Sequence, residues 1–525
     1  MAAIITDDFR RNQAKLLVND IKASADAAYD ASDLTSTMQD RYRENSNYAI
    51  GLGKTDSWPN DINGASEDTL DFIIKTPDGT LQETEDVINN LFTLKEIGAT
   101  AVSQLIAKNT WTLGRKYKAY DGSDNDCFYV TGDIYPSYAV HNGNIYLCLS
   151  NSAQSGATSE PIGATIAPSD TSQGIQSTGD SYVWAHIQSL PTAAPFDKFT
   201  TPQFAPILEE TDNSRIANST TKQGGLLSCI GITNGGTGYT STTTVSVTIA
   251  ENDGSQTDTS GYIFKPIISG NGVIERIEMQ FGTAQQLAGD NGSLTYWQNV
   301  IKGNAKSATV VISDANQPAG AQQATAFAKI SPTLGYAAKG IDILPSWFVG
   351  CIAEFQGNEG GDAQPLKFRQ VSLLKNFVRT EDNENPQTLS SYDALKYINV
   401  NGANFSTTVP GDVISQASSG AKFYFNSYLD GKLYFHQNTD PEVNFLDPNS
   451  GGTETKLLNL SSNSVEVATD VAVGSNGGVV QNAEYGHRVS NTNSDFNGKV
   501  IFHENRIPFQ RTATQTEEVK LIIQL

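Results

Sequence analysis

The segment 51–55, GLGKT, has the residue types of a phosphate-binding loop. Such a loop follows a strand, cradles phosphate with its backbone N–H groups and opens a helix. The complete motif has an earlier glycine at the position that Tyr48 occupies here, and Asp56, Trp58 and Pro59 stand where the helix should begin. We therefore interpret the segment as a strand end followed by a turn that Trp58 anchors, rather than as a nucleotide site.

The acidic residues Asp121, Asp124 and Asp126 lie close together and suggest a calcium loop. In an EF-hand the sixth position is glycine and the twelfth is glutamate. Asp126 and Gly132 occupy those two positions here, so the pattern fails. A solvated acidic turn is the favoured interpretation, and a casual cation near residues 121–126 stays open as the alternative.

The remaining reactive side chains show no catalytic or ligand spacing. They are the five histidines His141, His186, His436, His487 and His503, and the four cysteines Cys127, Cys148, Cys229 and Cys351. The adjacent carboxylates Glu209 and Glu210 could serve a glycosidase, but adjacency does not place two carboxyl groups across a sugar. We predict reduced, mostly buried thiols, no catalytic, cofactor-binding or metal residues, no cofactor and no enzymatic activity.

Composition limits the classes of partner. The 525 residues predict several domains, at roughly one per 150 residues. The formal net charge of −22 repels nucleic-acid phosphates and anionic lipid headgroups. The sequence has no apolar stretch of about 20 residues, and its N-terminus carries acids where a secretory signal carries positive charge. We expect a soluble protein made in a cytoplasm that binds neither nucleic acid nor membrane.

Two helices are predicted near the N-terminus. The first begins at Thr6, with Phe9, Leu16, Leu17 and Ile21 on its apolar face, and the second covers 83–95. From about residue 115, short apolar runs alternate with Gly, Asn, Asp and Ser turns, and residues 156–179 read as a surface loop.

Three features of this later part predict strands in particular. Asn142-Gly143 and Asp430-Gly431 predict hairpins, and the alternating apolar residues 519–525 predict a buried C-terminal strand. We expect a mainly β (α+β) protein of antiparallel β modules with a partly helical N-terminal region.

Four segments, taken in order, resemble one family. They are YAIGLGKTDSW at 48–58, GDSYVW at 179–184 with Leu190-Pro191, KFRQVS at 367–372, and the C-terminal 498–525 with ENRIP at 504–508 and QTEE at 515–518. Together they are similar to the gene-product-8 baseplate wedge subunits of T-even-type contractile-tailed phages. The resemblance covers about 1–226, 339–384 and 491–525. The segment ITNGGTGYT at 232–240 looks like a module of structural proteins from phages that infect marine cyanobacteria.

The resemblance implies a domain division. A helical or mixed region at 1–115, β-rich core at 116–226, a core segment at 339–384 and C-terminal core strands at 491–525 form the family part. Two β modules, 227–338 and 385–490, are expected as insertions into it.

The resemblance also implies a function. It predicts a virion protein of the tail baseplate that forms a homodimer, contacts other baseplate wedge proteins and assembles in the host cytoplasm. A tail adhesin or receptor-binding protein is the alternative, and a glycan-degrading tail enzyme is a weaker one.

Overall fold

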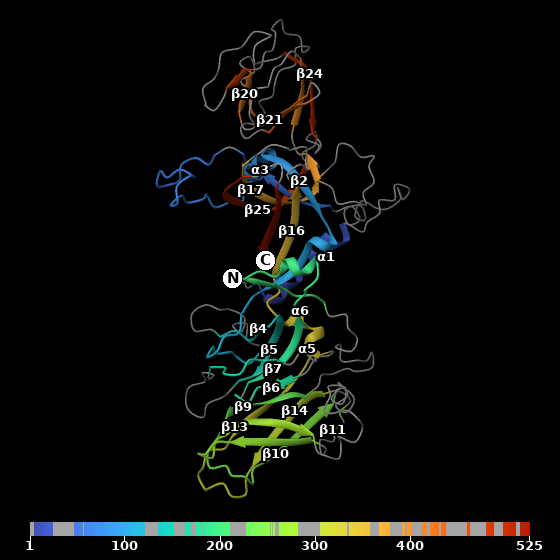
Figure 1. Cartoon of the computed structure of the whole chain (residues 1–525). Coiled ribbons are helices and arrows are strands. Elements are labelled where there is room, and N and C mark those ends of the chain that lie inside the picture. The colour runs from blue at the N-terminus through green and yellow to red at the C-terminus, as the bar shows by residue number, and fades with distance from the viewer. Residues whose placement is uncertain are drawn as a thin grey trace, which may run out of the picture. The chain divides into compact units, whose positions relative to one another are not determined.

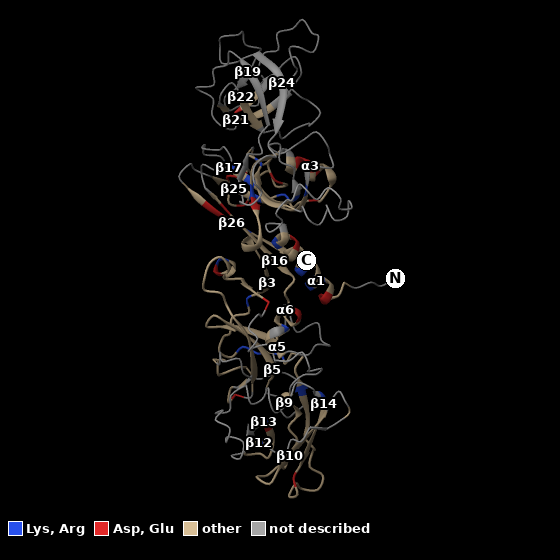
Figure 2. Cartoon of the chain, turned by 90° about the vertical axis from the view of Figure 1, so that its right-hand side faces the viewer, with Lys and Arg blue, Asp and Glu red and all other residues tan. Residues whose placement is uncertain are grey.

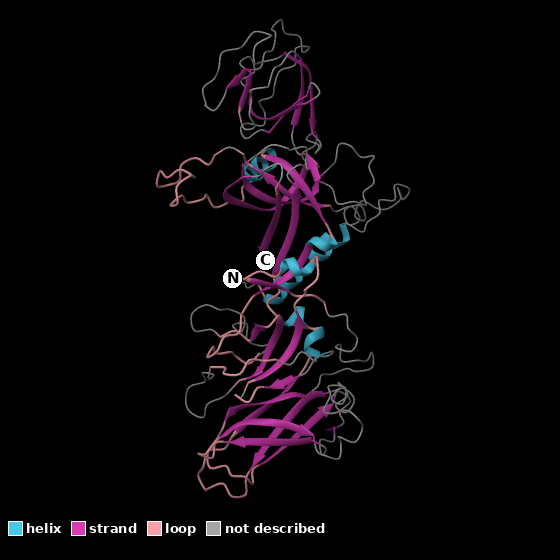
Figure 3. Cartoon of the chain, viewed as in Figure 1, coloured by secondary structure: helices cyan, strands magenta, loops and turns pink. Residues whose placement is uncertain are grey.

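The structure is a computed structural model of the chain. It describes residues 5–24, 47–55, 57–120, 135–151, 163–169, 175–180, 182–209, 227–251, 254, 256–257, 262–281, 305–332, 335–356, 367–377, 391–393, 396–401, 412–416, 421–429, 432–436, 459–461, 479–487, 497–510 and 515–525. Strands dominate these residues, as Figures 1 and 3 show, and they pair in antiparallel sheets, so the predicted mainly β fold is confirmed. The N-terminal helix is α1 (Asp7–Ser24).

Two compact units divide the chain. Unit 1 comprises residues 1–15, 103–349 and 524–525, and unit 2 comprises 16–102 and 350–523. This division differs from the six segments predicted from the sequence, whose boundaries stay a prediction.

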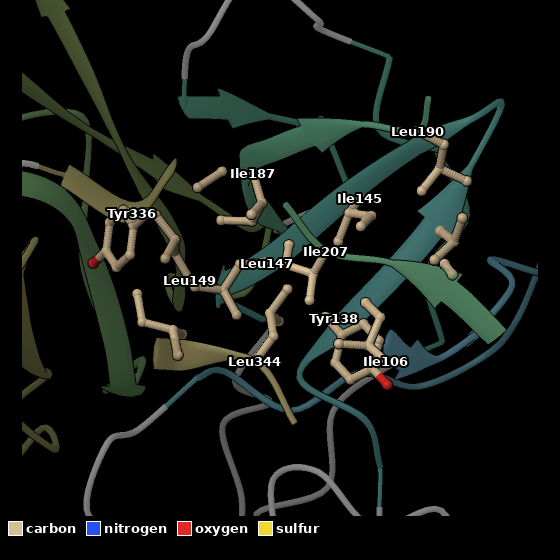
Figure 4. Packing of buried hydrophobic residues seen from close by; sticks show 14 of the residues in the cluster. Ile106, Tyr138, Ile145, Leu147, Leu149, Ile187, Leu190, Ile207, Tyr336 and Leu344 are labelled. Atoms are coloured by element: carbon tan, nitrogen blue, oxygen red, sulfur yellow. The ribbon is translucent and has the colours of Figure 1, made fainter. Parts of the chain in front are cut away.

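A four-stranded sheet lies at the centre of unit 1. Its order is β4 (Tyr138–His141), β5 (Asn144–Ser150), β7 (Val183–Ser189) and β6 (Ile175–Ser177), and β3 (Val102–Ala107) pairs separately with β8 (Phe204–Pro206). Short helical turns of unit 1 are η3 (Phe196–Phe199), α5 (Gly335–Ala338) and α6 (Gly340–Ile343), and η1 (Ala99–Ala101) belongs to unit 2. Figure 4 shows the core of this part, in which β-sheet residues such as Leu147 and Ile187 pack with Leu344.

The predicted Asn-Gly hairpin joins β4 and β5. Asn142 has φ of 45° and Gly143 has φ of 73°, the backbone that a tight type I′ turn requires. The register pairs His141 with Asn144 directly across this turn.

The predicted module at 227–338 is a set of three small sheets inside unit 1. It contains β9 (Leu227–Asn234), β10 (Thr244–Glu251), β11 (Gln256–Thr257), β12 (Tyr262–Ile268), β13 (Ile274–Phe281), β14 (Ala305–Ser313) and β15 (Thr325–Ile330). These strands enclose a core of their own that includes Val247, Phe264 and Ile277. However, Cys229 of β9 belongs to the main core of unit 1, so this strand is shared by both cores.

Side-chain hydrogen bonds fix the ITNGGTGYT segment within this module. The Tyr239 hydroxyl accepts from the Ala324 N–H at 2.7 Å. The Asp314 carboxylate accepts from the Thr240 N–H at 2.6 Å and from the hydroxyls of Thr242 and Thr243 at 2.8 Å each. The end of the segment and the threonines that follow it are therefore tied to Asp314, the residue directly after β14.

A five-stranded sheet forms the centre of unit 2. Its order is β18 (Ser391–Asp393), β2 (Leu91–Ile97), β1 (Tyr48–Gly53), β17 (Lys367–Phe377) and β25 (Asn497–Gln510). The helix α3 (Leu81–Asn89) precedes β2, and Ile88 packs on a core of Ala49, Leu94 and Leu374. The strands β16 (Phe348–Gln356) and β26 (Thr516–Gln524) are also neighbours in a sheet.

The predicted module at 385–490 contributes a separate six-stranded sheet to unit 2. Its order is β23 (Asn459–Ser461), β20 (Val413–Gln416), β21 (Ala421–Leu429), β22 (Lys432–His436), β19 (Lys396–Asn401) and β24 (Val479–His487). The predicted hairpin is confirmed, because β21 and β22 pair antiparallel and place Phe425 opposite Phe435. The turn residues Asp430 and Gly431 lie outside the described residues.

Both predicted helices needed correction. The helix expected over 83–95 ends at Asn89, and 91–97 form β2, because pairing with β1 offers these apolar residues two buried sheet faces. In α1 the Thr6 hydroxyl caps the Phe9 N–H as expected. However, Phe9 and Leu16 are exposed, and Ala14, Val18 and Ile21 form the buried stripe at i, i+4 and i+7.

Other strand predictions have mixed outcomes. The C-terminal strand is confirmed as β26, with Val519, Leu521 and Ile523 buried. The loop predicted over 156–179 contains the short strand β6, and the ENRIP segment at 504–508 lies inside β25.

Candidate functional site

The GLGKT segment serves strand packing. Gly51 and Gly53 lie in β1, which is buried along its whole length. A Cβ atom at Gly51 would lie 2.6 Å from Cδ2 of Leu91, and one at Gly53 would lie 2.8 Å from the carbonyl oxygen of Asn90. These glycines therefore let β1 and the chain entering β2 approach closely, and the interpretation as a strand end and turn is confirmed.

A buried ion pair connects the loop between β1 and α3 to β17. Arg369 lies on β17, and its side chain is 2% exposed, while the Glu67 side chain is 5% exposed. The guanidinium Nε donates to Glu67 Oε2 at 2.7 Å, and NH2 donates to Glu67 Oε1. NH1 donates to the Thr55 carbonyl at 2.5 Å. We call this the Arg369–Glu67 anchor.

Trp58 extends the anchor to β25. Its backbone N–H donates to Glu67 Oε2, and its indole Nε1–H donates to the carbonyl of Arg506, both at 2.9 Å. The Lys54 ammonium lies 4.6 Å from the centre of the indole ring, within reach of a cation–π interaction. Trp58 therefore anchors the turn after β1, as predicted.

A second polar link lies beside the anchor. Gln370 of β17 donates from Nε2 to Asn505 Oδ1 of β25 at 3.0 Å. Asn505 in turn donates from Nδ2 to the carbonyl of Lys75 at 2.9 Å. The loop between β1 and α3 is thus fixed to β17 and β25 at more than one point.

The anchor keeps Glu67 charged. Burial alone would raise the pKa of the Glu67 carboxyl, but the hydrogen bonds from Arg369 and Trp58 and the guanidinium charge lower this pKa to about 2. Because both oxygens of Glu67 and all three nitrogens of the guanidinium are engaged by protein, the anchor is built to hold the loop, and its ions are committed to that role.

Tyr182 and Trp184 of the GDSYVW segment lie in a hydrophobic core of unit 1. Tyr182 stacks on Trp184 with 5.7 Å between the ring centres, and Tyr117 meets Trp184 edge-on at 5.0 Å. Asp180 accepts the backbone N–H groups of Thr165 and Ile166 at 2.7 and 2.8 Å. This segment therefore closes a loop and fills a core.

The other candidate residues are spread over the structure. His141, His186, His436, His487 and His503 belong to five different strands. His186 hydrogen-bonds to Asn144 Oδ1 at 3.1 Å. Cys148, Cys229 and Cys351 are buried, as predicted, and burial raises the pKa of Cys229 and of Cys351 to about 12.

Several predicted positions lie outside the described residues. They are Cys127, Glu210 and the acidic residues Asp121, Asp124 and Asp126. Within the described residues, no group of three or more His, Cys, Asp or Glu side chains could hold a metal ion. Among the helices described, none is both long enough and apolar enough to cross a membrane.

Comparison with known proteins gives no assignment. No protein-family profile matches the chain, and a search of curated proteins finds no significant match.

The anchor itself was missed from the sequence. Arg369 belongs to the KFRQVS segment, but its partner Glu67 lies 302 positions away in the sequence and in none of the four segments of the resemblance. No local pattern marks such a pair, although the clustering of Lys54, Trp58 and acids after a buried strand was a signal that this loop is anchored.

Proposed function

We propose that this protein is a structural subunit of the baseplate wedge of a contractile phage tail, assembling as a homodimer with other wedge proteins. The observation that supports it is the convergence of three of the four segments on which the family resemblance depends. Trp58 of the first segment, Arg369 of the third and Arg506 of the fourth all take part in the anchor. Segments far apart in the sequence thus act together in the fold.

The physical character of the anchor suits this role. In the anchor, a buried ion pair holds a loop in place. Loops that a rigid scaffold holds in place are common binding sites for other proteins. The β module of unit 1 and the separate six-stranded sheet of unit 2 add further such surfaces. A wedge subunit needs a large surface with many partners and no covalent chemistry.

Electron microscopy of virions tests the location. Antibody fragments raised against the purified protein are expected at the distal plate of the tail. The matched control is the same fragments after adsorption with the purified protein, which should remove the label. Label at the tips of fibres would contradict the proposal and support an adhesin.

The mass of the purified particle tests the assembly. Light scattering should give twice the chain mass of 56.4 kDa. A trimer would instead favour the adhesin. Depolymerisation of host-surface polysaccharide by the purified protein would favour the glycan-degrading enzyme and contradict the structural role.

A further inference from the structure

The loop between β1 and α3 presents apolar side chains to solvent. Ile62 is 91% exposed, Leu70 is 109% exposed and Ile73 is 51% exposed. All three lie within one short segment, 62–73, which is part of the loop next to α3 in Figure 1. Single exposed apolar residues are ordinary on a protein surface, but a group of them on one loop marks a contact site when the loop is held in place.

Asp61 holds this part of the loop in place. Its carboxylate accepts the backbone N–H groups of Asn63 and Ala65 at 2.8 Å and that of Ile73 at 2.9 Å. These hydrogen bonds, above all that from Ile73, lower the pKa of the Asp61 carboxyl. Asp61 thereby ties the two ends of segment 61–73 together.

The Arg369–Glu67 anchor fixes the middle of the same segment. Glu67 lies between Ile62 and Leu70 in sequence and is held to β17 by Arg369. The backbone that carries the exposed apolar side chains is therefore held in place before any partner binds. Ordering in advance lowers the conformational entropy that binding would otherwise cost.

The charges beside Leu70 indicate the chemistry of the partner. Asp68 and Asp71 are exposed and flank Leu70 on both sides, and acidic residues continue into α3, as the red positions near its label in Figure 2 show. In a symmetric contact at this loop, a second copy would bring the same acidic residues against Asp68 and Asp71, and like charges repel. A partner with basic residues around an apolar socket would be attracted to it.

We propose that the loop 60–74 is a docking element for a different protein chain, whose apolar socket, rimmed by Lys and Arg, receives Leu70 together with Ile62 and Ile73. The inference rests on the proposed function in one respect, because the other wedge proteins would supply such a partner chain. The surface chemistry of the loop is testable without that role.

The test selects peptides from a displayed library of random peptides on the immobilised full-length protein. Bound peptides are then titrated against the wild type and four full-length variants. Leu70→Ser and Ile62→Ser remove apolar contact, and Asp68→Lys combined with Asp71→Lys reverses the flanking charge. Val311→Ser is the matched control, because Val311 is 55% exposed on β14, away from this loop in the chain.

We expect a class of peptides that combine apolar residues with Lys or Arg and that lose affinity on the order of thirtyfold with Leu70→Ser, the loss at which an interface residue counts as a hot spot. The charge-reversal variant should weaken the same peptides, and Val311→Ser should not. Because the altered side chains are exposed, the variants should have the melting temperature of the wild type. Unfolding is then excluded as the cause of the lost peptide affinity.

Two results would overturn the proposal. One is a selection in which no peptide class depends on Leu70, or in which the dependent peptides are acidic. The other is a Leu70→Ser or Ile62→Ser variant that sediments as a smaller particle than the wild type, since the loop would then bind a second copy. Neither result decides where in the virion the protein lies, so failure here is distinct from failure of the proposed function.

Discussion

Breaking the Arg369–Glu67 anchor should destabilise unit 2 strongly. Arg369→Met keeps much of the side-chain volume but removes the charge that neutralises the buried Glu67 carboxylate. Removing one member of a buried pair typically costs about 3–5 kcal/mol. The lowered pKa of Glu67, about 2 against an ordinary value of 4.5, converts to about 3 kcal/mol by the linkage of one pKa unit to 1.36 kcal/mol. The two routes agree.

Urea unfolding followed by tryptophan fluorescence measures this loss, because Trp58 is part of the anchor. Glu67→Gln should also destabilise, since it leaves the buried guanidinium without its counter-ion. The loss in the free energy of unfolding of the double variant should be smaller than the sum of the two single losses, by a coupling energy of roughly 1–3 kcal/mol. Lys339→Met is the control, because Lys339 and Asp342 form an exposed pair worth at most about 1 kcal/mol.

The pH dependence supplies an independent check with a definite sign. A carboxyl whose folded pKa is lowered contributes stability that is complete above its unfolded pKa, near 4.5, and is lost as the pH falls toward about 2. The difference in the free energy of unfolding between the wild type and Arg369→Met should therefore shrink as the pH falls from 5 to 2. An Arg369→Met protein that is as stable as the control at pH 7, or additive single losses, would refute the reasoning.

Three further predictions follow from other parts of the fold. Gly143→Ala should lower the stability of unit 1 by about 1 kcal/mol in thermal melts, because φ of 73° strains any residue with a Cβ although nothing lies within 4 Å of that position; an unchanged melt would contradict the turn. Truncation after Gln515 should give insoluble protein, since Val519, Leu521 and Ile523 of β26 are buried and are worth roughly 1.5–3 kcal/mol each; rapid proteolysis within 516–525 of a native particle would contradict this. Replacement of 396–487 by a short linker should leave a folded protein by circular dichroism, because these residues form their own sheet; aggregation with every linker tried would show that the sheet is integral to unit 2.

Local chemistry determined which elements the sequence revealed. The Asn142-Gly143 hairpin was predictable because the turn type depends only on two residues that adopt positive φ. The strand β26 was predictable because its alternating apolar residues have the period of a half-buried strand. Neither prediction required knowledge of distant parts of the chain.

The helix predicted over 83–95 failed for the opposite reason. Val87, Leu91 and Leu94 are all buried and fit a helical stripe as well as a strand. What ends α3 at Asn89 is the edge of β1, to which β2 pairs antiparallel. Because that partner lies some 40 residues earlier, roughly four times the length of a typical element, no window on this segment could contain the deciding information.

The anchor shows why residues that suggested chemistry serve architecture instead. A glycine can let the backbone approach a phosphate, but Gly53 instead lets the chain at Asn90 approach β1. The sequence alone does not distinguish these two roles. An arginine that could bind an anionic ligand is neutralised by Glu67, a partner that only the fold brings to it. With these groups committed internally, recognition is left to the exposed side chains that the anchor positions. This arrangement suits the proposed wedge subunit, and we expect the loop around Leu70 to be the site at which a partner binds.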